Sequence, residues 1–362
     1  MYTYWFLLLF IFVMFHVLVH GKIIQKNIYT ICIFGVLLLI STLRAPTVGG
    51  DLQHYLPNFY WIGRKSFTEI FLDRIKYGYV YSLICKLTFM IDRSNIAFLL
   101  STSIVNLIFV TCFVRKHSHN LWLSFFIYIT FGFYTNTFNS VRSSMAVGIG
   151  LIMYDFILKK KFLAFFLLYL VALEIHQTFF PFVFLYFIYN IKITYKYIFF
   201  TIGLSFIISQ IGRYVSFISL IAYAYDQGAY SDIGDSYTGG YNMLAILIAL
   251  TLLAFTYLNL KGKMSDINKL YIHSLVFACC IQCFATYYQV LNRVSLFFYI
   301  CVIVFIPNLL KTISNKQLQL ITTYGVIFFM LIFFNIKIMT PTKQFGNNNY
   351  QSTIPYKTYW EK

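Results

Sequence analysis

The chain has 362 residues, of which 60% are hydrophobic and 11% are charged, and its formal net charge is +17. No soluble fold needs that much apolar surface, and apolar runs of about 20 residues, the length that crosses a bilayer, recur along the whole chain. This composition excludes a soluble enzyme and a nucleic-acid-binding domain. The runs are continuous rather than alternating, so the expected fold is an all-α polytopic membrane protein.

We expect about 12 transmembrane helices, with a range of roughly 10 to 14, in one transmembrane domain over residues 1–362. The expected crossings are 4–19, 28–43, 96–114, 121–135, 141–158, 162–175, 178–190, 197–211, 242–260, 269–289, 294–310 and 318–335. The stretch 162–189 can also be one long crossing instead of two broken ones. The run 77–91 is short and contains Lys86, which predicts a re-entrant or interfacial segment.

The orientation follows from Lys and Arg in short loops, which stay on the cytoplasmic side. Six such loops are marked by cations at 22–26, 115–116, 159–161, 192–196, 261–263 and 311–316. Loops 44–95 and 212–241 and the C-terminal tail, 336–362, are then external. Loop 44–95 is itself rich in Lys and Arg, which conflicts with an external position.

A metal or cofactor site is not expected. All seven Cys residues lie in apolar runs, where small side chains pack well, and no His or carboxylate group has the spacing of metal ligands.

The carboxylates that this topology places outside are the candidate bases: Asp51, Glu69, Asp73, Glu174, Asp226, Asp232 and Asp235. Glu174 and His176 interrupt an otherwise apolar stretch, and ionisable groups at membrane depth usually face a cavity or pathway. Residues two apart do not share a helical face, unless the helix breaks between them. A structural role for His176 remains the alternative.

Arg142 opens an expected crossing, where a cation opposes the helix macrodipole. The position therefore favours a fixed cation that faces an external cleft over one that stabilises its own helix. A snorkelling interfacial Arg is the alternative. Arg293 has the same character, before the crossing 294–310.

Several short motifs follow one another along the chain. They are Gly49-Gly50-Asp51-Leu52-Gln53-His54-Tyr55, Lys76-Tyr77-Gly78-Tyr79, Arg142-Ser143-Ser144-Met145-Ala146, His176-Gln177-Thr178, Arg293 with Phe297-Phe298-Tyr299, and Pro355-Tyr356. Gly-Gly-Asp by itself is typical of a turn, and each of the other motifs is short.

In order and spacing these motifs resemble those of the EpsG family of Wzy-like oligosaccharide polymerases, over nearly the whole chain. Two positions depart from the family pattern. Lys76 stands where the family carries an acidic residue, and Ser143 stands where it often carries Gln.

The resemblance implies a glycosyltransferase that polymerises polyprenyl-diphosphate-linked repeat units at the outer face of the bacterial cytoplasmic (inner) membrane. The product would be an O-antigen, a capsule or an exopolysaccharide. The partners would be the lipid-linked oligosaccharide, membrane lipid, a chain-length regulator and a flippase, with no nucleic acid. The reaction would use no metal and no cofactor.

The resemblance also implies site roles. The candidate bases are His176, Glu174 and Asp51, in that order, and Arg142 is both catalytic and diphosphate-binding. The remaining expected contacts are Arg293 and Arg44 to the diphosphate, and Gly49, Gly50, Tyr55 and Tyr356 to other parts of the substrate.

Two other functions fit the same composition. A flippase or other secondary transporter of lipid-linked oligosaccharide also needs cations in a cavity, although many transporters show internal repeats and none is visible here. A polyprenyl-dependent ligase is the second alternative.

The topology can be tested by labelling single cysteines in intact cells. We expect an impermeant maleimide to reach cysteines placed at 226–240 and to miss those in 115–120, 159–161, 261–268 and 311–317, because the clustered cations hold these loops inside. Permeabilised cells serve as the control, since all positions should then react. Label on residue 160 in intact cells would contradict this orientation.

Overall fold

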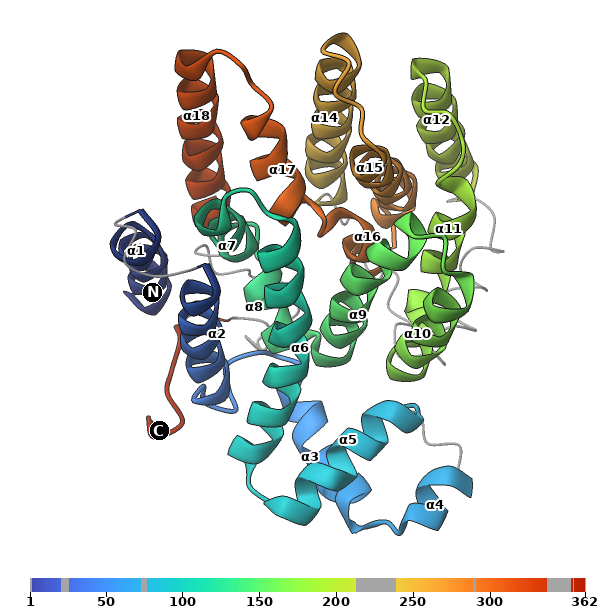
Figure 1. Ribbon diagram of the computed structural model, residues 1–362. Helices are drawn as coiled ribbons and strands as arrows, with labels where there is room; N and C mark the ends of the chain where they lie inside the picture. Colours follow the sequence, from blue (N-terminus) through green and yellow to red (C-terminus); the bar gives the residue numbers. More distant parts are fainter. Residues whose placement is uncertain are drawn as a thin grey trace. The chain divides into compact units, whose positions relative to one another are not determined.

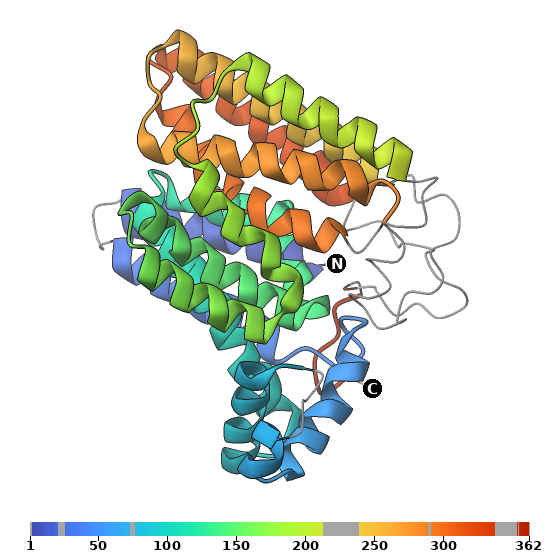
Figure 2. The ribbon, with the colours of Figure 1, turned by 90° about the vertical axis from the view of Figure 1, so that its right-hand side faces the viewer.

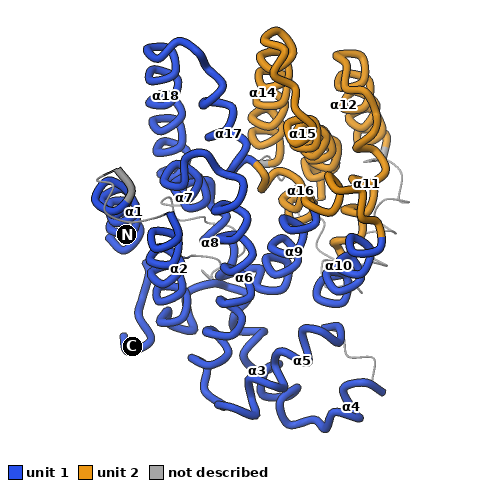
Figure 3. The backbone as a smooth tube through the Cα atoms, in the orientation of Figure 1, with its two compact units in different colours: residues 1–153, 163–177, 302–362 blue, residues 154–162, 178–301 orange. Residues whose placement is uncertain are grey.

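The computed structural model describes residues 2–20, 26–72, 77–212, 239–288, 291–336, 353 and 355–361. Within these residues the protein is helical, apart from one isolated bridge between Arg44 and Thr358 (Figure 1). The chain falls into two compact units (Figure 3). Unit 1 comprises 1–153, 163–177 and 302–362, and unit 2 comprises 154–162 and 178–301. The single domain expected over 1–362 stays a prediction.

Unit 1 contains most of the helices. They are α1 (Tyr2–Phe15) with the π-helical turn His16–His20, α2 (Lys26–Thr42), α3 (Leu52–Arg64), α4 (Phe67–Leu72), α5 (Tyr79–Ile91), α6 (Asn95–His117), α7 (Leu121–Thr130), α8 (Phe133–Asn139), most of α9 (Val141–Leu158), most of α10 (Phe162–Ile175), α17 (Val302–Lys311) and α18 (Lys316–Phe334). Unit 2 contains the 3₁₀ helix Gln177–Val183 beyond its first residue, α11 (Phe184–Ile188), α12 (Tyr195–Gly212), α14 (Gly239–Leu260), α15 (Asp266–Ala285) and α16 (Leu291–Tyr299).

Six helical segments among the described residues are long and apolar enough to cross a membrane. They are 95–117, 141–158, 240–260, 266–285, 291–311 and 316–334. Shorter apolar helices cover the other expected crossings, at 2–18, 26–42, 121–130, 162–175, 177–188 and 195–211. The all-helical membrane fold is therefore confirmed, whereas the count of about 12 crossings is not.

The helix is interrupted in three of the expected apolar stretches. The sequence predicts a continuous helix in two of them, and in the third, 162–189, it allows either one crossing or two. The crossing expected at 121–135 ends as α7 at Thr130, because Gly132 adopts a positive φ of 89° and starts the separate helix α8. The segment 291–311 divides into α16 and α17, and the stretch 162–189 breaks at His176.

The 44–95 region forms three short helices, α3 to α5, that lie near the N-terminal end of α6 (Figure 1). The 13 residues of α5 extend about 20 Å, which is shorter than the hydrocarbon core. Helices at other expected crossings, such as α7 with 10 residues, are as short, so the re-entrant or interfacial placement of 77–91 stays a prediction.

Small polar side chains join α2 to α6 in unit 1. The hydroxyl oxygens of Ser41 and Ser103 lie 2.6 Å apart, and both residues are buried. Small residues allow close approach of helices in lipid, and their hydroxyls find partners across the interface.

The described part of the C-terminal tail pairs with the end of α2. The amide of Ala45 donates to the carbonyl oxygen of Lys357 at 2.9 Å, and that of Tyr359 donates to Leu43 at 2.8 Å. The Tyr4 hydroxyl donates to the carbonyl oxygen of Thr353 at 3.0 Å, which adds α1 to this junction. Both ends of unit 1 are therefore held at the exit of α2.

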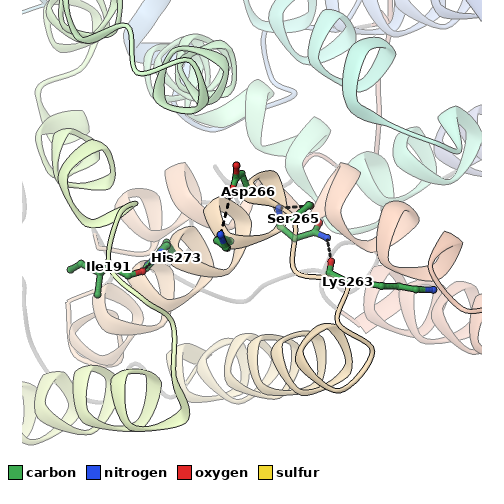
Figure 4. A network of polar contacts seen from close by, with 7 residues as sticks. Ile191, Lys263, Ser265, Asp266 and His273 are labelled. Carbon is green, nitrogen blue, oxygen red and sulfur yellow. Dashed lines mark hydrogen bonds and ion pairs between the residues drawn. The ribbon is translucent and has the colours of Figure 1, made fainter.

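In unit 2, α12 and α14 run beside α15 (Figure 2). Ser265 caps the start of α15 through its hydroxyl, and Asp266 follows it (Figure 4). Lys269 pairs with Asp266 at 3.0 Å in the first turn. The buried His273 ring places Nε2 3.0 Å from the carbonyl oxygen of Ile191. This histidine therefore anchors the α11–α12 connection to α15. The expected external loop at 212–241 lies mostly outside the described residues.

Candidate functional site

The Gly-Gly-Asp turn is pressed against the end of α8. Gly49 has a φ of 103°, and a Cβ there would collide with the carbonyl oxygen of Phe138. The amide of Gly50 donates to the Asn139 side-chain oxygen at 2.8 Å. Asp51 occupies the N-cap position directly before α3, and its side chain forms no capping hydrogen bond there. The turn thus places Asp51 beside the segment that leads to Arg142.

Arg142 lies near the start of α9 and binds the end of α10. Its Nε donates to the carbonyl oxygen of Ile175 at 2.9 Å. The last carbonyls of a helix carry partial negative charge and lack partners within the helix, so a cation is stabilised there. Arg142 opposes the dipole of its own helix, α9, and its contact with the end of α10 offsets that unfavourable interaction.

Two tyrosine rings line the guanidinium of Arg142. Its central carbon lies 5.2 Å from the ring centroid of Tyr77 and 5.5 Å from that of Tyr81, within the range of cation–π contacts. Among the described residues, the bond from Nε is the one hydrogen bond that Arg142 makes. Within the described residues, no hydrogen bond engages the Nη groups, which form the two-pronged end of a guanidinium.

Glu174 caps α5. Its carboxylate accepts a hydrogen bond from the amide of Tyr79 at 3.2 Å, in the first turn of that helix. Gly78 has a φ of 77°, and a Cβ there would collide with the carbonyl oxygen of Glu174. A carboxylate is favourable at a helix N-terminus, where amides lack partners. Glu174 thus has a structural contact, and its role as a base stays a prediction.

His176 occupies the break after α10. Its amide closes the last turn by donating to the carbonyl oxygen of Ala172 at 2.9 Å, and its side chain is half-buried. The residue directly follows Ile175, whose carbonyl oxygen binds Arg142. Because α10 ends here, Glu174 and His176 do not have to lie on different faces of one helix.

The Tyr55 ring reaches the same tyrosines, with its centroid 6.1 Å from that of Tyr81. The neighbouring Asn58 places Nδ2 2.5 Å from the Tyr77 hydroxyl. Sequence reasoning did not single out Tyr81 or Asn58. Tyr77 precedes α5, and its N-cap Gly78 has a positive φ, so no helical spacing in the sequence indicates that the Tyr77 and Tyr81 rings meet.

Arg44 and Tyr356 lie at the junction with the C-terminal tail. Arg44 is 1% exposed, stands 4.6 Å from the ring centroid of Phe138, and donates to the carbonyl and hydroxyl oxygens of Ser41. Burial lowers its pKa to about 10, which leaves it protonated at neutral pH. The Tyr356 hydroxyl donates to the carbonyl oxygen of Ile40 at 2.7 Å. Both residues have packing contacts here, and their substrate roles stay predictions.

Other expected site residues are placed less directly. Arg293 is half-buried on α16 in unit 2, so its assignment to the same diphosphate site stays a prediction. Glu69 lies on α4, where it forms a capping pair with Ser66. Asp73, Lys76, Asp226, Asp232 and Asp235 lie outside the described residues.

The model of one protein family, the EpsG family, matches residues 27–358. The chain belongs to the EpsG family. Members of this family are Wzy-like polymerases, and membership indicates a membrane protein of polysaccharide biosynthesis. No curated protein matches the chain, and no solved structure does.

In this EpsG protein, four motifs that are far apart in the sequence meet within unit 1. The 49–55 turn contacts the 138–142 segment, and the 77–81 segment contacts both Arg142 and Glu174. The centre of these contacts is the Arg142 guanidinium. In the part of the chain that is described, no three His, Cys, Asp or Glu side chains gather as a metal site requires, and metal independence stays a prediction.

Gly78→Ala tests the close approach of α5 to α10. We expect the variant to lose about 2 kcal/mol or more of stability, because a Cβ must displace a backbone carbonyl and the positive φ is strained. The measurement is thermal melting of the purified protein in detergent. Gly35→Ala on α2 is the matched control, since open space surrounds that position and alanine favours a helix. Equal melting of Gly78→Ala and wild type would refute the contact.

Glu174→Gln and Glu174→Ala test the cap on α5. Gln keeps an oxygen that can accept from Tyr79, so we expect wild-type melting. Ala removes the acceptor and should cost about 1 kcal/mol. Loss of stability in the Gln variant equal to that in the Ala variant would show that hydrogen bonding to Tyr79 is not what Glu174 contributes.

Proposed function

We propose that this protein is a glycosyltransferase that polymerises polyprenyl-diphosphate-linked oligosaccharide repeat units into O-antigen, capsule or exopolysaccharide at the outer face of the cytoplasmic membrane. The observation that carries the proposal is the convergence of the family motifs on Arg142, whose Nη donors no described residue uses. Family membership over 27–358 supports the same reaction.

The reaction displaces a lipid diphosphate from a sugar. The acceptor hydroxyl oxygen forms a bond to the anomeric carbon of the donor sugar, and the bond from that carbon to the diphosphate oxygen breaks. Negative charge then grows on the departing diphosphate, and fixed donors that face it lower the barrier. The planar fork of Arg142 suits two phosphate oxygens at once.

The acceptor hydroxyl must lose its proton to a base. His176 is our first choice, because it follows the carbonyl that holds Arg142 and because histidine is the most common general base. Asp51 lies beside the 138–142 segment as the next candidate. Glu174 is less suited, since its carboxylate already caps α5.

Arg142→Lys separates this role from a packing role. Lys keeps the charge and a donor for the Ile175 carbonyl, but it loses the two-pronged geometry. We therefore expect Arg142→Lys and Arg142→Ala both to abolish or strongly shorten the polymer while the protein accumulates normally. The measurement is the glycan ladder of cells that carry each variant, with protein level read from the membrane fraction.

Arg115→Lys is the matched control, because Arg115 is exposed in the last turn of α6 and lies outside the described site. Wild-type chain lengths for Arg142→Lys would overturn the assignment of Arg142. Single repeat units on the acceptor identify a lost polymerase, whereas an acceptor with no repeat units identifies a lost flippase or ligase and would overturn the proposed reaction.

Glu174→Gln extends the same assay. With normal melting, an intact ladder supports the capping role, and a lost ladder assigns the base to Glu174 in place of His176.

A further inference from the structure

An open groove of about 390 Å³ lies along α3 and the start of α4. Its lining residues are Pro57, Tyr60, Trp61, Arg64, Lys65 and Glu69. This volume falls in the range of small-molecule sites, about 300 to 1,000 Å³. None of these residues belongs to the Arg142 site, and we call the feature the Trp61 groove.

The Trp61 groove presents an aromatic surface with polar groups around it. The Trp61 side chain is 49% exposed, so much of its indole ring is open to a ligand. The Lys65 Nζ lies 4.4 Å from the ring centroid, so one face of the indole carries a cation and the ring is held in place.

The other lining residues are positioned by hydrogen bonds. The Tyr60 hydroxyl donates to the Asn95 side-chain oxygen at 3.1 Å. The Glu69 carboxylate accepts from the amide of Ser66 at 2.5 Å, and the amide of Glu69 donates to the Ser66 hydroxyl at 3.1 Å. This reciprocal pair is a capping box, which fixes the start of α4. The groove is thus preorganised by contacts within α3, α4 and α6.

The groove begins one helical turn from the Arg142 site. Asn58 contacts Tyr77, which covers the Arg142 guanidinium. Trp61 is three residues further along α3, so it lies on nearly the same face as Asn58. From Tyr55 to Arg64 the helix rises about 14 Å, which is enough for a short oligosaccharide.

The exposed side chains of α3 suit a glycan, whereas those of α4 and α5 suit lipid. Most exposed side chains of α3 are polar or amphipathic, namely Gln53, His54, Trp61 and Arg64, and the remaining one is Pro57. Those of α4 and α5 include the strongly apolar Phe71, Leu72, Leu87, Met90 and Ile91. Acyl chains suit the second surface. An aromatic ring beside charged donors and a carboxylate suits the apolar faces and hydroxyl groups of a sugar.

We propose that the Trp61 groove binds a segment of the glycan chain next to the reacting sugar, so that it acts as an oligosaccharide subsite and Trp61 as its stacking platform. This inference rests on the proposed function, because its occupant is the glycan of that reaction. The subsite holds the chain between successive additions and so lengthens the product.

The test measures binding and chain length separately. Full-length protein in nanodiscs of zwitterionic lipid is titrated calorimetrically with lipid-free oligosaccharide released from the surface polysaccharide of the host strain. We expect Trp61→Ala to weaken binding about tenfold or more, as loss of an aromatic anchor does, and to shorten the polymer without abolishing it. Trp61→Phe keeps an aromatic ring and should retain most of the oligosaccharide binding and most of the polymer length.

Trp360→Ala is the matched control, since Trp360 is 69% exposed and lies outside the groove. Absence of oligosaccharide binding to wild type, or equal binding and chain length in Trp61→Ala, would overturn the subsite. So would Trp61-dependent binding of phosphatidylglycerol vesicles without oligosaccharide binding, because it assigns the groove to lipid. The proposed function fails by a different result, normal polymer from Arg142→Lys, and oligosaccharide binding does not depend on that reaction.

Discussion

The hydrogen bond from Arg142 to the carbonyl oxygen of Ile175 is the contact on which the rest of the candidate site depends. It joins the start of α9 to the end of α10, two places where a helix leaves backbone groups without partners. The bond brings the 174–176 segment beside Arg142, and the 77–81 segment contacts both Arg142 and Glu174.

Two glycines allow the remaining segments to come close. Gly49 and Gly78 both have positive φ values, and both press against a backbone carbonyl where a Cβ has no room. Backbone contacts of this kind leave little freedom in the turns that they join. The tyrosines and the Gly-Gly-Asp turn are therefore held by the scaffold and not by loop side chains, which is the arrangement that a preorganised site requires.

Charged residues in this protein make packing contacts that charge alone does not reveal. Arg44 is buried against Phe138 and the end of α2, and Glu174 caps α5. Arg142 also has a packing contact, but it uses only Nε. The same physical demand, a partner for helix ends and buried charges, explains all three contacts, and among the described residues Arg142 hydrogen-bonds through Nε alone.

The sequence alone determined the membrane class, the positions of most helices, the order of the motifs and the family, because apolar run length and motif order are local properties of the chain. Tertiary structure decided which motifs meet. The partner of Arg142 is a backbone carbonyl, which has no signature in the sequence, and the roles of Glu174 and Gly78 depend on the approach of two helices about 95 residues apart. The Trp61 groove likewise forms from residues of two helices and has no signature in hydropathy.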